Sequence, residues 1–239
     1  MIRRMSRPQS KRDVFNEPAY TAQEAAHILF LPLSTLKAWC FGQVSQGASG
    51  KARNFAPVIE PADPSKRLLS FANLCELHVL AAIRRKHRIP LPRVRDSLTY
   101  VSRELNSKRP LIDKEFMTNG VDLFVQHASH LLNVSKHGQR SMRGDFEAAL
   151  ARLERNNRGA PIRLFPYSRT STTFVDQPKT IVIDPTLSFG RPVIARAAVP
   201  TGIILDRFRA GDSLAEMAGD YGVSVQEIEE ALRFEQRAA

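Results

Sequence analysis

The sequence predicts an α+β, mostly helical chain with a winged helix-turn-helix head, a bridging region and a small helical C-terminal domain. Two capped helix pairs with helix-turn-helix spacing lie near the two ends of the chain. Short strand-like runs follow the first pair, and basic charge is concentrated in the first half. We expect the divisions to fall at 1–17, 18–110, 111–178 and 179–239.

The composition is that of an ordinary globular protein. Of 239 residues, 43% are hydrophobic and 25% charged, enough apolar material to form a core without metals or disulfides. Cys40 and Cys75 are too few and too far apart in sequence for a disulfide framework, which favours the reducing cytosol. The basic N-terminus has no apolar segment behind it, and no long uncharged apolar run exists. We therefore expect neither a signal peptide nor a membrane span, and a cytoplasmic location.

The net charge of +11 is unevenly distributed. Residues 1–110 hold 19 basic and 8 acidic residues, whereas residues 201–239 hold 4 basic and 8 acidic ones. This pattern suggests a polyanionic partner for the front half only, although a merely soluble basic surface is the alternative. Residues 1–17 are basic and almost without apolar partners, so we expect a disordered arm.

The segment from Tyr20 predicts the first helix pair. Thr21 and Glu24 form a capping box that starts a helix, and Pro32 prevents its simple continuation. We expect Ser34 to cap a second helix, with Leu36 and Trp39 turned inward. The outward face would then carry small, hydroxyl and cationic side chains, which suit the DNA major groove.

A loop over 42–54 follows, and then two short strand candidates at 55–61 and 66–71. This order is typical of a winged helix-turn-helix, in which the hairpin reaches a second part of the duplex. The alternative is an αα-hairpin packed within a core. The DNA-binding candidates are Ser34, Thr35, Lys37, Lys51 and Arg53.

Residues 20–105 resemble the DNA-binding head of the MerR regulators. The matching residues are Tyr20, Thr21, Glu24, Ala25, Ala26, Leu29, Pro32, Ser34, Thr35, Leu36, Lys37 and Trp39, followed by the run LLSFANLCELHVLAAIRR at 68–85. Two features depart from the family pattern. Phe30 occupies the turn position that usually carries glycine, and the helix from Arg93 is too short for the family's dimerising coiled coil.

The middle of the chain is predicted from periodicity and turn signals. We expect helices at 72–88, from Arg93, and at 141–157, a hairpin or small meander at 115–135 with an Asn-Gly turn, and a linker or extended arm at 158–180. The helix from Arg93 has an apolar seam of Val94, Leu98, Val101 and Leu105. This seam predicts a homodimer contact, or else packing on helix 72–88 within one chain.

The C-terminal run predicts a strand, a turn and three helices, two of them capped by Ser213 and Ser224. Its second pair also has helix-turn-helix spacing, but Glu227, Glu229 and Glu230 would repel phosphates. We therefore expect protein–protein contact, with a solvated acidic face as the alternative. The run resembles a domain of unknown function found in antitoxins paired with PIN-like toxins. The matching residues are Ile183, Asp184, Pro185, Gly190, Pro192, Ile194, Pro200, Ile204, Gly211, Ser213, Glu216, Met217, Tyr221, Val223, Ile228, Ala231, Leu232 and Phe234.

A MerR-like head joined to this tail resembles a VapB-type antitoxin. The resemblance implies a non-enzymatic chain that neutralises a PIN-like ribonuclease toxin and autoregulates its operon by binding operator DNA as a homodimer. A cation of the antitoxin could then occupy the toxin's acidic metal site. The candidates in the extended arm are Arg163 and Arg169, with Phe165 and Tyr167 as aromatic anchors.

Two other functions remain open. A stand-alone, ligand-responsive MerR-like regulator would need an effector pocket in residues 111–239, and a pure interaction adaptor would not bind DNA. Nothing predicts catalysis, a cofactor or a metal. GASGK at 47–51 lacks the spacing of a phosphate-binding loop, and His127 and His130, expected in a strand, would point to opposite faces. Cys40 and Cys75 are expected to be buried small hydrophobic residues.

Overall fold

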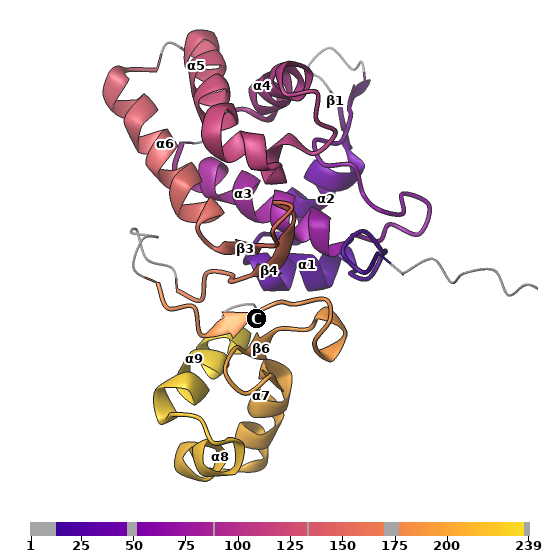
Figure 1. Cartoon of the computed structure of the whole chain (residues 1–239). Coiled ribbons are helices and arrows are strands. Elements are labelled where there is room, and N and C mark those ends of the chain that lie inside the picture. The colour runs from indigo at the N-terminus through magenta and orange to yellow at the C-terminus, as the bar shows by residue number, and fades with distance from the viewer. Residues whose placement is uncertain (1–12, 47–51, 88, 133, 170–176, 237–239) are drawn as a thin grey trace, which may run out of the picture.

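The computed structural model describes residues 13–46, 52–87, 89–132, 134–169 and 177–236. It shows an N-terminal lobe, residues 13–169, above a smaller C-terminal lobe, residues 181–236, drawn in orange and yellow (Figure 1). The prediction of a mostly helical α+β chain with a helix-turn-helix is confirmed.

One helix forms the centre of the N-terminal lobe. The first elements are α1 (Ala22–Leu29), α2 (Leu33–Phe41), β1 (Gln43–Gln46), β2 (Ala52–Phe55), α3 (Phe71–His87) and α4 (Leu91–Glu104). Every residue from 71 to 82 is buried, so α3 lies surrounded by the others rather than exposing one face. Its C-terminal His87 contacts Asp145, with 2.7 Å between Nε2 and Oδ2.

The expected hairpin at 115–135 is wrong, because this segment is helical. A short 3₁₀ turn η1 (Pro110–Ile112) leads to a π-helical turn η2 (Phe116–Gly120) and α5 (Val121–Leu132). Phe116, Gly120, Phe124 and Ala128 recur every four residues and are all buried. Gly120 marks close packing rather than a turn, since a Cβ there would lie 2.5 Å from the Phe116 side chain.

The prediction of a linker or extended arm at 158–180 is also wrong for the described residues up to 169. Helix α6 runs over Lys136–Leu150, earlier than expected, and antiparallel strands β3 (Leu153–Arg155) and β4 (Pro161–Leu164) follow. Phe165 and Tyr167 are buried in the chain's own interior. Leu164 then bridges to Ile183, which connects β4 to the start of the C-terminal lobe.

The C-terminal lobe contains the expected helices on a small sheet. Its elements are β5 (Ile181–Val182), η3 (Ser188–Gly190), β6 (Val193–Ile194), β7 (Val199–Pro200), α7 (Thr201–Ala210), α8 (Leu214–Tyr221) and α9 (Val225–Gln236). The caps are confirmed: the Ser213 and Ser224 hydroxyls accept from the backbone N–H groups of Glu216 and Glu227, both at 3.2 Å. The sequence predicted a single strand before these helices, whereas the structure has a three-stranded antiparallel sheet in the order β5-β6-β7.

The main hydrophobic core does not divide at residue 110. It runs from Tyr20 to Ile183, and a second core lies in the C-terminal lobe. The dimer seam expected on α4 belongs to the first core, since Val94, Leu98 and Val101 are buried within the chain and α4 packs on α5. Leu105 is half-buried beside them. These side chains are therefore not free to form the predicted dimer contact, which favours the alternative of packing within one chain.

Arg152, directly after α6, holds the segment that leads to the C-terminal lobe. Its buried guanidinium donates to four backbone carbonyl oxygens, those of Phe165, Pro166, Gln177 and Pro178, at 2.5 to 3.1 Å. Its Cζ also lies 4.9 Å from the centre of the Tyr167 ring. One side chain thus fixes residues 165–167 and 177–178 against each other.

Arg152→Met should destabilise the protein by about 3 kcal/mol or more, because buried carbonyl oxygens would lose their donor while the side-chain volume is kept. Urea denaturation followed by the fluorescence of Trp39, the single tryptophan, measures the change. Arg158→Met, at an exposed position, is the control and should alter stability by less than about 0.5 kcal/mol. Equal effects of the two substitutions would show that Arg152 does not carry this structural role.

Candidate DNA-binding site and its connection to the C-terminal lobe

Helices α1 and α2 form the helix-turn-helix. The capping box at the start of α1 is confirmed: the Thr21 hydroxyl accepts from the Glu24 N–H at 3.2 Å, and the Glu24 carboxylate accepts from the Thr21 N–H at 2.8 Å. The expected cap of α2 is wrong. The helix begins at Leu33 with Pro32 in the capping position, so Ser34 lies inside the first turn and does not cap it.

The two faces of α2 differ as the sequence predicts. Leu36 and Trp39 are buried, whereas Ser34 and Lys37 are exposed and Thr35 is half-buried. Lys37 forms no ion pair with any residue that the structure describes. The N-terminal half of α2 therefore presents hydroxyl groups and a cation to solvent, beside a helix N-terminus that favours a phosphate.

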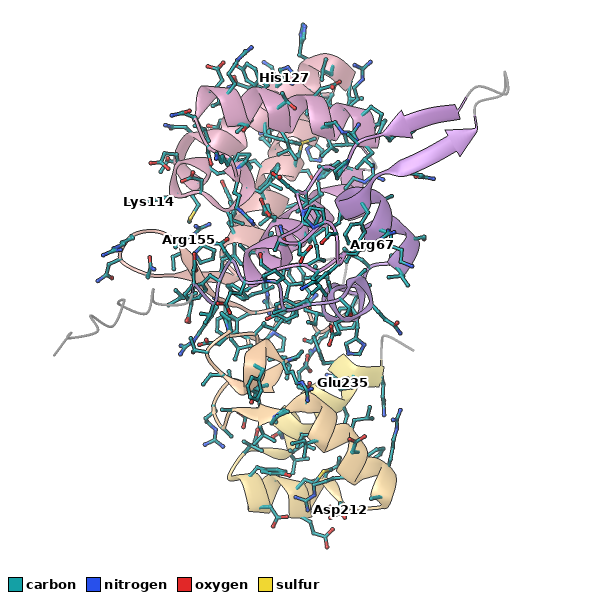
Figure 2. The ribbon with its side chains drawn as sticks, turned by 90° about the vertical axis from the view of Figure 1, so that its right-hand side faces the viewer. Arg67, Lys114, His127, Arg155, Asp212 and Glu235 are labelled. Atoms are coloured by element: carbon teal, nitrogen blue, oxygen red, sulfur yellow. The ribbon has the colours of Figure 1, made fainter. Side chains whose placement is uncertain are left out.

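A hairpin follows α2, although its strands differ from those expected. Strands β1 and β2 pair from Gln43↔Phe55 to Gln46↔Ala52. Of the expected strands, 55–61 contributes only Phe55 to β2, and 66–71 forms only isolated bridges at Leu68 and Leu69. Figure 2 shows this hairpin projecting from the body of the N-terminal lobe. Arg53 lies in β2 opposite Ser45, and Lys51 falls outside the described residues.

Two cations near α2 were missed in the sequence. The Arg67 guanidinium lies 4.5 Å from the centre of the Phe41 ring, and that of Arg84 lies 5.8 Å from the Trp39 ring. Both positions are more than 20 residues beyond α2, so neither belongs to a local motif. A positive φ of 56° at Arg67 marks a tight turn that brings it back to α2.

Phe30, at the turn between α1 and α2, connects the two lobes. It adopts the left-handed conformation, with φ 51° and ψ 46°, in which a glycine is usual. Its ring meets that of Phe234 edge-on, with 5.2 Å between their centres, and packs on the C-terminal core. The departure from glycine thus has a structural reason, because the side chain at this turn contributes to the other lobe's packing.

Polar contacts reinforce this junction. His27 of α1 and Glu235 of α9 lie 3.0 Å apart, and the Tyr20 hydroxyl donates to the Gly190 carbonyl, also at 3.0 Å. Figure 2 shows Glu235 between the two lobes. Burial acts to raise the Glu235 pKa, but hydrogen bonds from His27 and Thr201 outweigh it and lower the pKa. The C-terminal lobe is therefore docked on the helix that precedes α2.

The arginines predicted to reach a toxin are paired within the chain. Arg163 donates to Asp184 at 2.9 Å and to Glu154 at 3.3 Å, and Arg169 donates to Glu230 at 2.9 Å. Burial acts to raise the Glu230 pKa, but hydrogen bonds from Arg169 and Ser168 outweigh it and lower the pKa. Arg163, Phe165 and Arg169 thus contact the C-terminal lobe or the segment leading to it, whereas Tyr167 stacks on His78 of α3 with 5.0 Å between ring centres. Their role in toxin binding stays a prediction.

The remaining candidates have structural surroundings. Cys40 and Cys75 are buried free thiols, as predicted, and burial raises the pKa of each. His127 lies in α5, not in a strand, and stacks on Tyr100 with 4.5 Å between ring centres. The described residues contain no group of three or more possible metal ligands. None of the described helices is long and apolar enough to cross a membrane.

Two family models match the chain. Residues 18–98 match the family described as "Putative DNA-binding HTH domain", and residues 181–234 match "Protein of unknown function (DUF433)". The first contains α1, α2 and the hairpin, and the second contains almost the whole C-terminal lobe. The sequence resemblance predicted a domain of unknown function in this part of the chain.

Two proteins of Mycobacterium tuberculosis are similar over nearly the whole chain. "Putative antitoxin VapB45" is 27% identical over 236 residues, covering 91% of this chain and 94% of that protein. "Uncharacterized protein Rv2308" is 20% identical over 242 residues, covering 96% and 95%. The crystal structure of Rv2018 from the same organism superposes with a TM-score of 0.65 at 22% identity, covering 91% of this chain and 99% of that one. The chain shares the Rv2018 fold.

Phe30→Ala should destabilise the protein more than Phe30→Gly, by about 1 kcal/mol, because alanine keeps the cost of the left-handed backbone and glycine does not. Both substitutions remove the contact with Phe234 and should lower stability relative to the parent. Urea denaturation of the three proteins measures the order. An alanine variant as stable as the glycine variant would contradict a left-handed residue at this turn.

Proposed function

We propose that this protein is the antitoxin of a toxin–antitoxin pair, which neutralises a PIN-like ribonuclease toxin and represses its own operon by binding DNA. The helix-turn-helix with an exposed first half of α2 is the observation that carries the DNA-binding part. Similarity to "Putative antitoxin VapB45" over nearly the whole chain supports the antitoxin part.

In this proposal α2 enters the major groove of the operator. Ser34, Thr35 and Lys37 face the DNA, and the β1–β2 hairpin with Arg53 acts as the wing of a MerR-like head. A palindromic operator would be bound by a homodimer through a surface other than the buried seam of α4.

The C-terminal lobe is the better candidate for the toxin surface. Four large hydrophobic side chains are exposed among the described residues, and three of them, Phe189, Ile203 and Phe208, lie in this lobe. Phe189 is 95% exposed on a turn whose φ of 57° is strained for a non-glycine residue. A rigidly presented aromatic side chain is typical of the anchors that dominate protein interfaces.

Arg191 gives this surface a cation. It is exposed, lies two residues from Phe189, and borders the same groove as Ile203. No described residue forms an ion pair with it. Arg191 can therefore reach a carboxylate cluster on a toxin without breaking an internal bond, whereas Arg163 and Arg169 would first have to leave their carboxylates.

Lys37→Ala combined with Arg53→Ala should weaken binding to the DNA upstream of the operon without unfolding the protein. Each lost phosphate contact lowers the salt slope by about 0.9, so the slope should fall by up to roughly 2. Fluorescence anisotropy at several salt concentrations measures both quantities. Arg140→Ala with Arg158→Ala removes the same charge from exposed positions elsewhere and should leave specific binding intact. A parent protein that does not bind this DNA, with or without toxin, would rule out the operator role.

Phe189→Asp combined with Ile203→Asp should abolish neutralisation of the toxin encoded beside this protein's gene. Loss of an interface anchor typically costs about 2 kcal/mol or more, a fall of roughly 30-fold in affinity. Growth on co-expression and co-purification of the two proteins measure the outcome. Met117→Asp, which changes an exposed hydrophobic side chain of the N-terminal lobe, is the control and should keep rescue. Full rescue by the double variant would place the toxin surface elsewhere, and failure of the parent to bind the toxin would refute the antitoxin function.

A further inference from the structure

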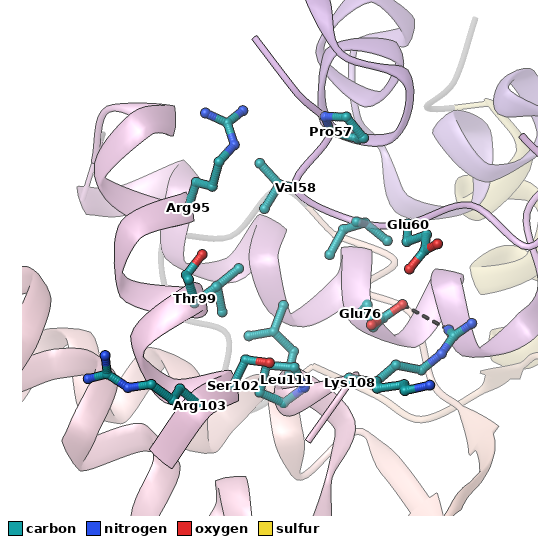
Figure 3. A pocket seen from close by; sticks show the side chains of 14 residues that line it. Pro57, Val58, Glu60, Glu76, Arg95, Thr99, Ser102, Arg103, Lys108 and Leu111 are labelled. Atoms are coloured by element: carbon teal, nitrogen blue, oxygen red, sulfur yellow. Dashed lines mark hydrogen bonds and ion pairs between the residues drawn. The ribbon is translucent and has the colours of Figure 1, made fainter. Parts of the chain in front are cut away.

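A cleft of about 710 Å³ lies behind the β1–β2 hairpin. Residues 57–60, which leave β2, form one wall and helix α4 forms another, while residues 108–111 and Glu76 of α3 close the remaining side. Figure 3 shows Arg95, Thr99 and Arg103 on one side of the cleft and Glu76 and Lys108 on the other. Its volume falls within the roughly 300–1,000 Å³ of small-molecule sites.

Cations outnumber carboxylates around this cleft. Arg95, Arg103, Lys108 and Arg109 line it, against Glu60 and Glu76. The Arg103 side chain is 75% exposed and pairs with Glu104 at 3.2 Å, whereas Lys108 has no ion-pair partner in the part of the chain that the structure describes. Glu104 beside Arg103 adds a third carboxylate, so the cleft keeps a small excess of positive charge, which favours an anionic ligand.

The cleft also has apolar side chains in its lining. Ile59, Leu98 and Leu111 are buried side chains that contribute to its lining, and Val58 adds a half-buried one. A lining that combines apolar side chains with cations suits a molecule that has both an organic body and an anionic group. It suits duplex DNA less well, because the phosphate backbone offers no apolar body and would meet the Glu60 and Glu76 carboxylates.

We propose that this cleft binds a small phosphorylated organic molecule about the size of a mononucleotide, with its phosphate at Lys108 and Arg109 and its body against Val58, Leu98 and Leu111. Guanidinium groups match phosphate oxygens in paired hydrogen bonds, and the ammonium of Lys108 adds a second charge. The assignment is independent of the antitoxin function. It also places an effector pocket in residues 57–111, not in the 111–239 region where a ligand-responsive regulator was expected to have one.

Glu76, the ion-pair partner of Arg109, can give up its contact to an incoming phosphate. Arg109 donates to Glu76 at 3.0 Å, so an incoming phosphate must share or replace that contact. Burial raises the pKa of Glu76 to about 7, although Arg109 and Asn73 act to lower it and nearby Glu60 acts to raise it. A carboxylate that can take up a proton near neutral pH loses its repulsion toward the phosphate at little cost.

The cleft is connected to the DNA-binding helix. The backbone N–H groups of Val58 and Ile59 donate to the carbonyl oxygen of Trp39, in α2, at 2.7 and 3.1 Å. A ligand against residues 57–60 is thus one hydrogen bond away from α2. Ligand binding should therefore change the affinity for DNA, and DNA should change the affinity for ligand by the same factor.

Calorimetric titration of the full-length protein with ADP, inorganic pyrophosphate and adenosine tests the proposal. ADP should bind most tightly, pyrophosphate more weakly and adenosine least, since only ADP offers both the body and the charges. Arg103→Glu combined with Lys108→Glu should lower ADP affinity at least tenfold. Arg140→Glu combined with Arg158→Glu makes the same change of charge at exposed positions outside the cleft and should lower it less than twofold.

Three results would overturn the proposal. The parent protein could fail to bind ADP at millimolar concentration, or the control variant could lose ADP as strongly as the cleft variant, which would indicate unspecific attraction. Operator DNA could displace ADP completely while the cleft variant loses DNA binding to the same extent, which would make the cleft a contact for the DNA backbone. Thermal unfolding of each variant verifies the fold, and Lys108→Ala, a milder change at an exposed residue, repeats the test if the double variant unfolds.

Discussion

The bond network of Arg152 is the constraint on which the two-lobed structure depends. Its guanidinium donates to the carbonyl oxygens of residues 165, 166, 177 and 178 and so holds these two segments next to the end of α6. The chain is thereby returned to β4, where Leu164 bridges to Ile183 and the C-terminal lobe begins. Arg169 and Glu230 extend the same connection to α9. The interface between the lobes is therefore built on polar contacts of the bridge as well as on the aromatic contact at Phe30.

Local signals in the sequence predicted local structure well. The capping boxes at Thr21, Ser213 and Ser224 are formed, because the donor and acceptor lie within four residues of each other. The inward faces of α1 and α2 follow directly from the spacing of their apolar residues. The second unit and its helices were recognisable for the same reason, since each helix has its own start signal and its own apolar face.

Features that depend on distant contacts were not predictable in this way. The Asn-Gly pair at 119–120 indicated a turn, but Phe116 and Phe124, eight residues apart, both pack on Phe146 of α6, and the segment between them is helical. The sequence of 158–169 predicts an arm because Pro, Ser and Thr give no periodicity. The hydrogen-bond donor that holds residues 165 and 166 in place is the guanidinium of Arg152, outside this stretch. Arg67 and Arg84 reach α2 only through the tertiary fold, which also brings the cations of the cleft together.

The position of Phe30 limits how such proteins can be recombined. Phe30 sets the turn between the two helices of the helix-turn-helix and also packs on the core of the C-terminal lobe, so the two modules depend on each other. A transplanted C-terminal lobe without an aromatic residue at the position of Phe234 would leave this ring without its edge-on partner. A chimaera would then need a compensating change at residue 30, so inheritance of the two modules as a pair is the simpler evolutionary route.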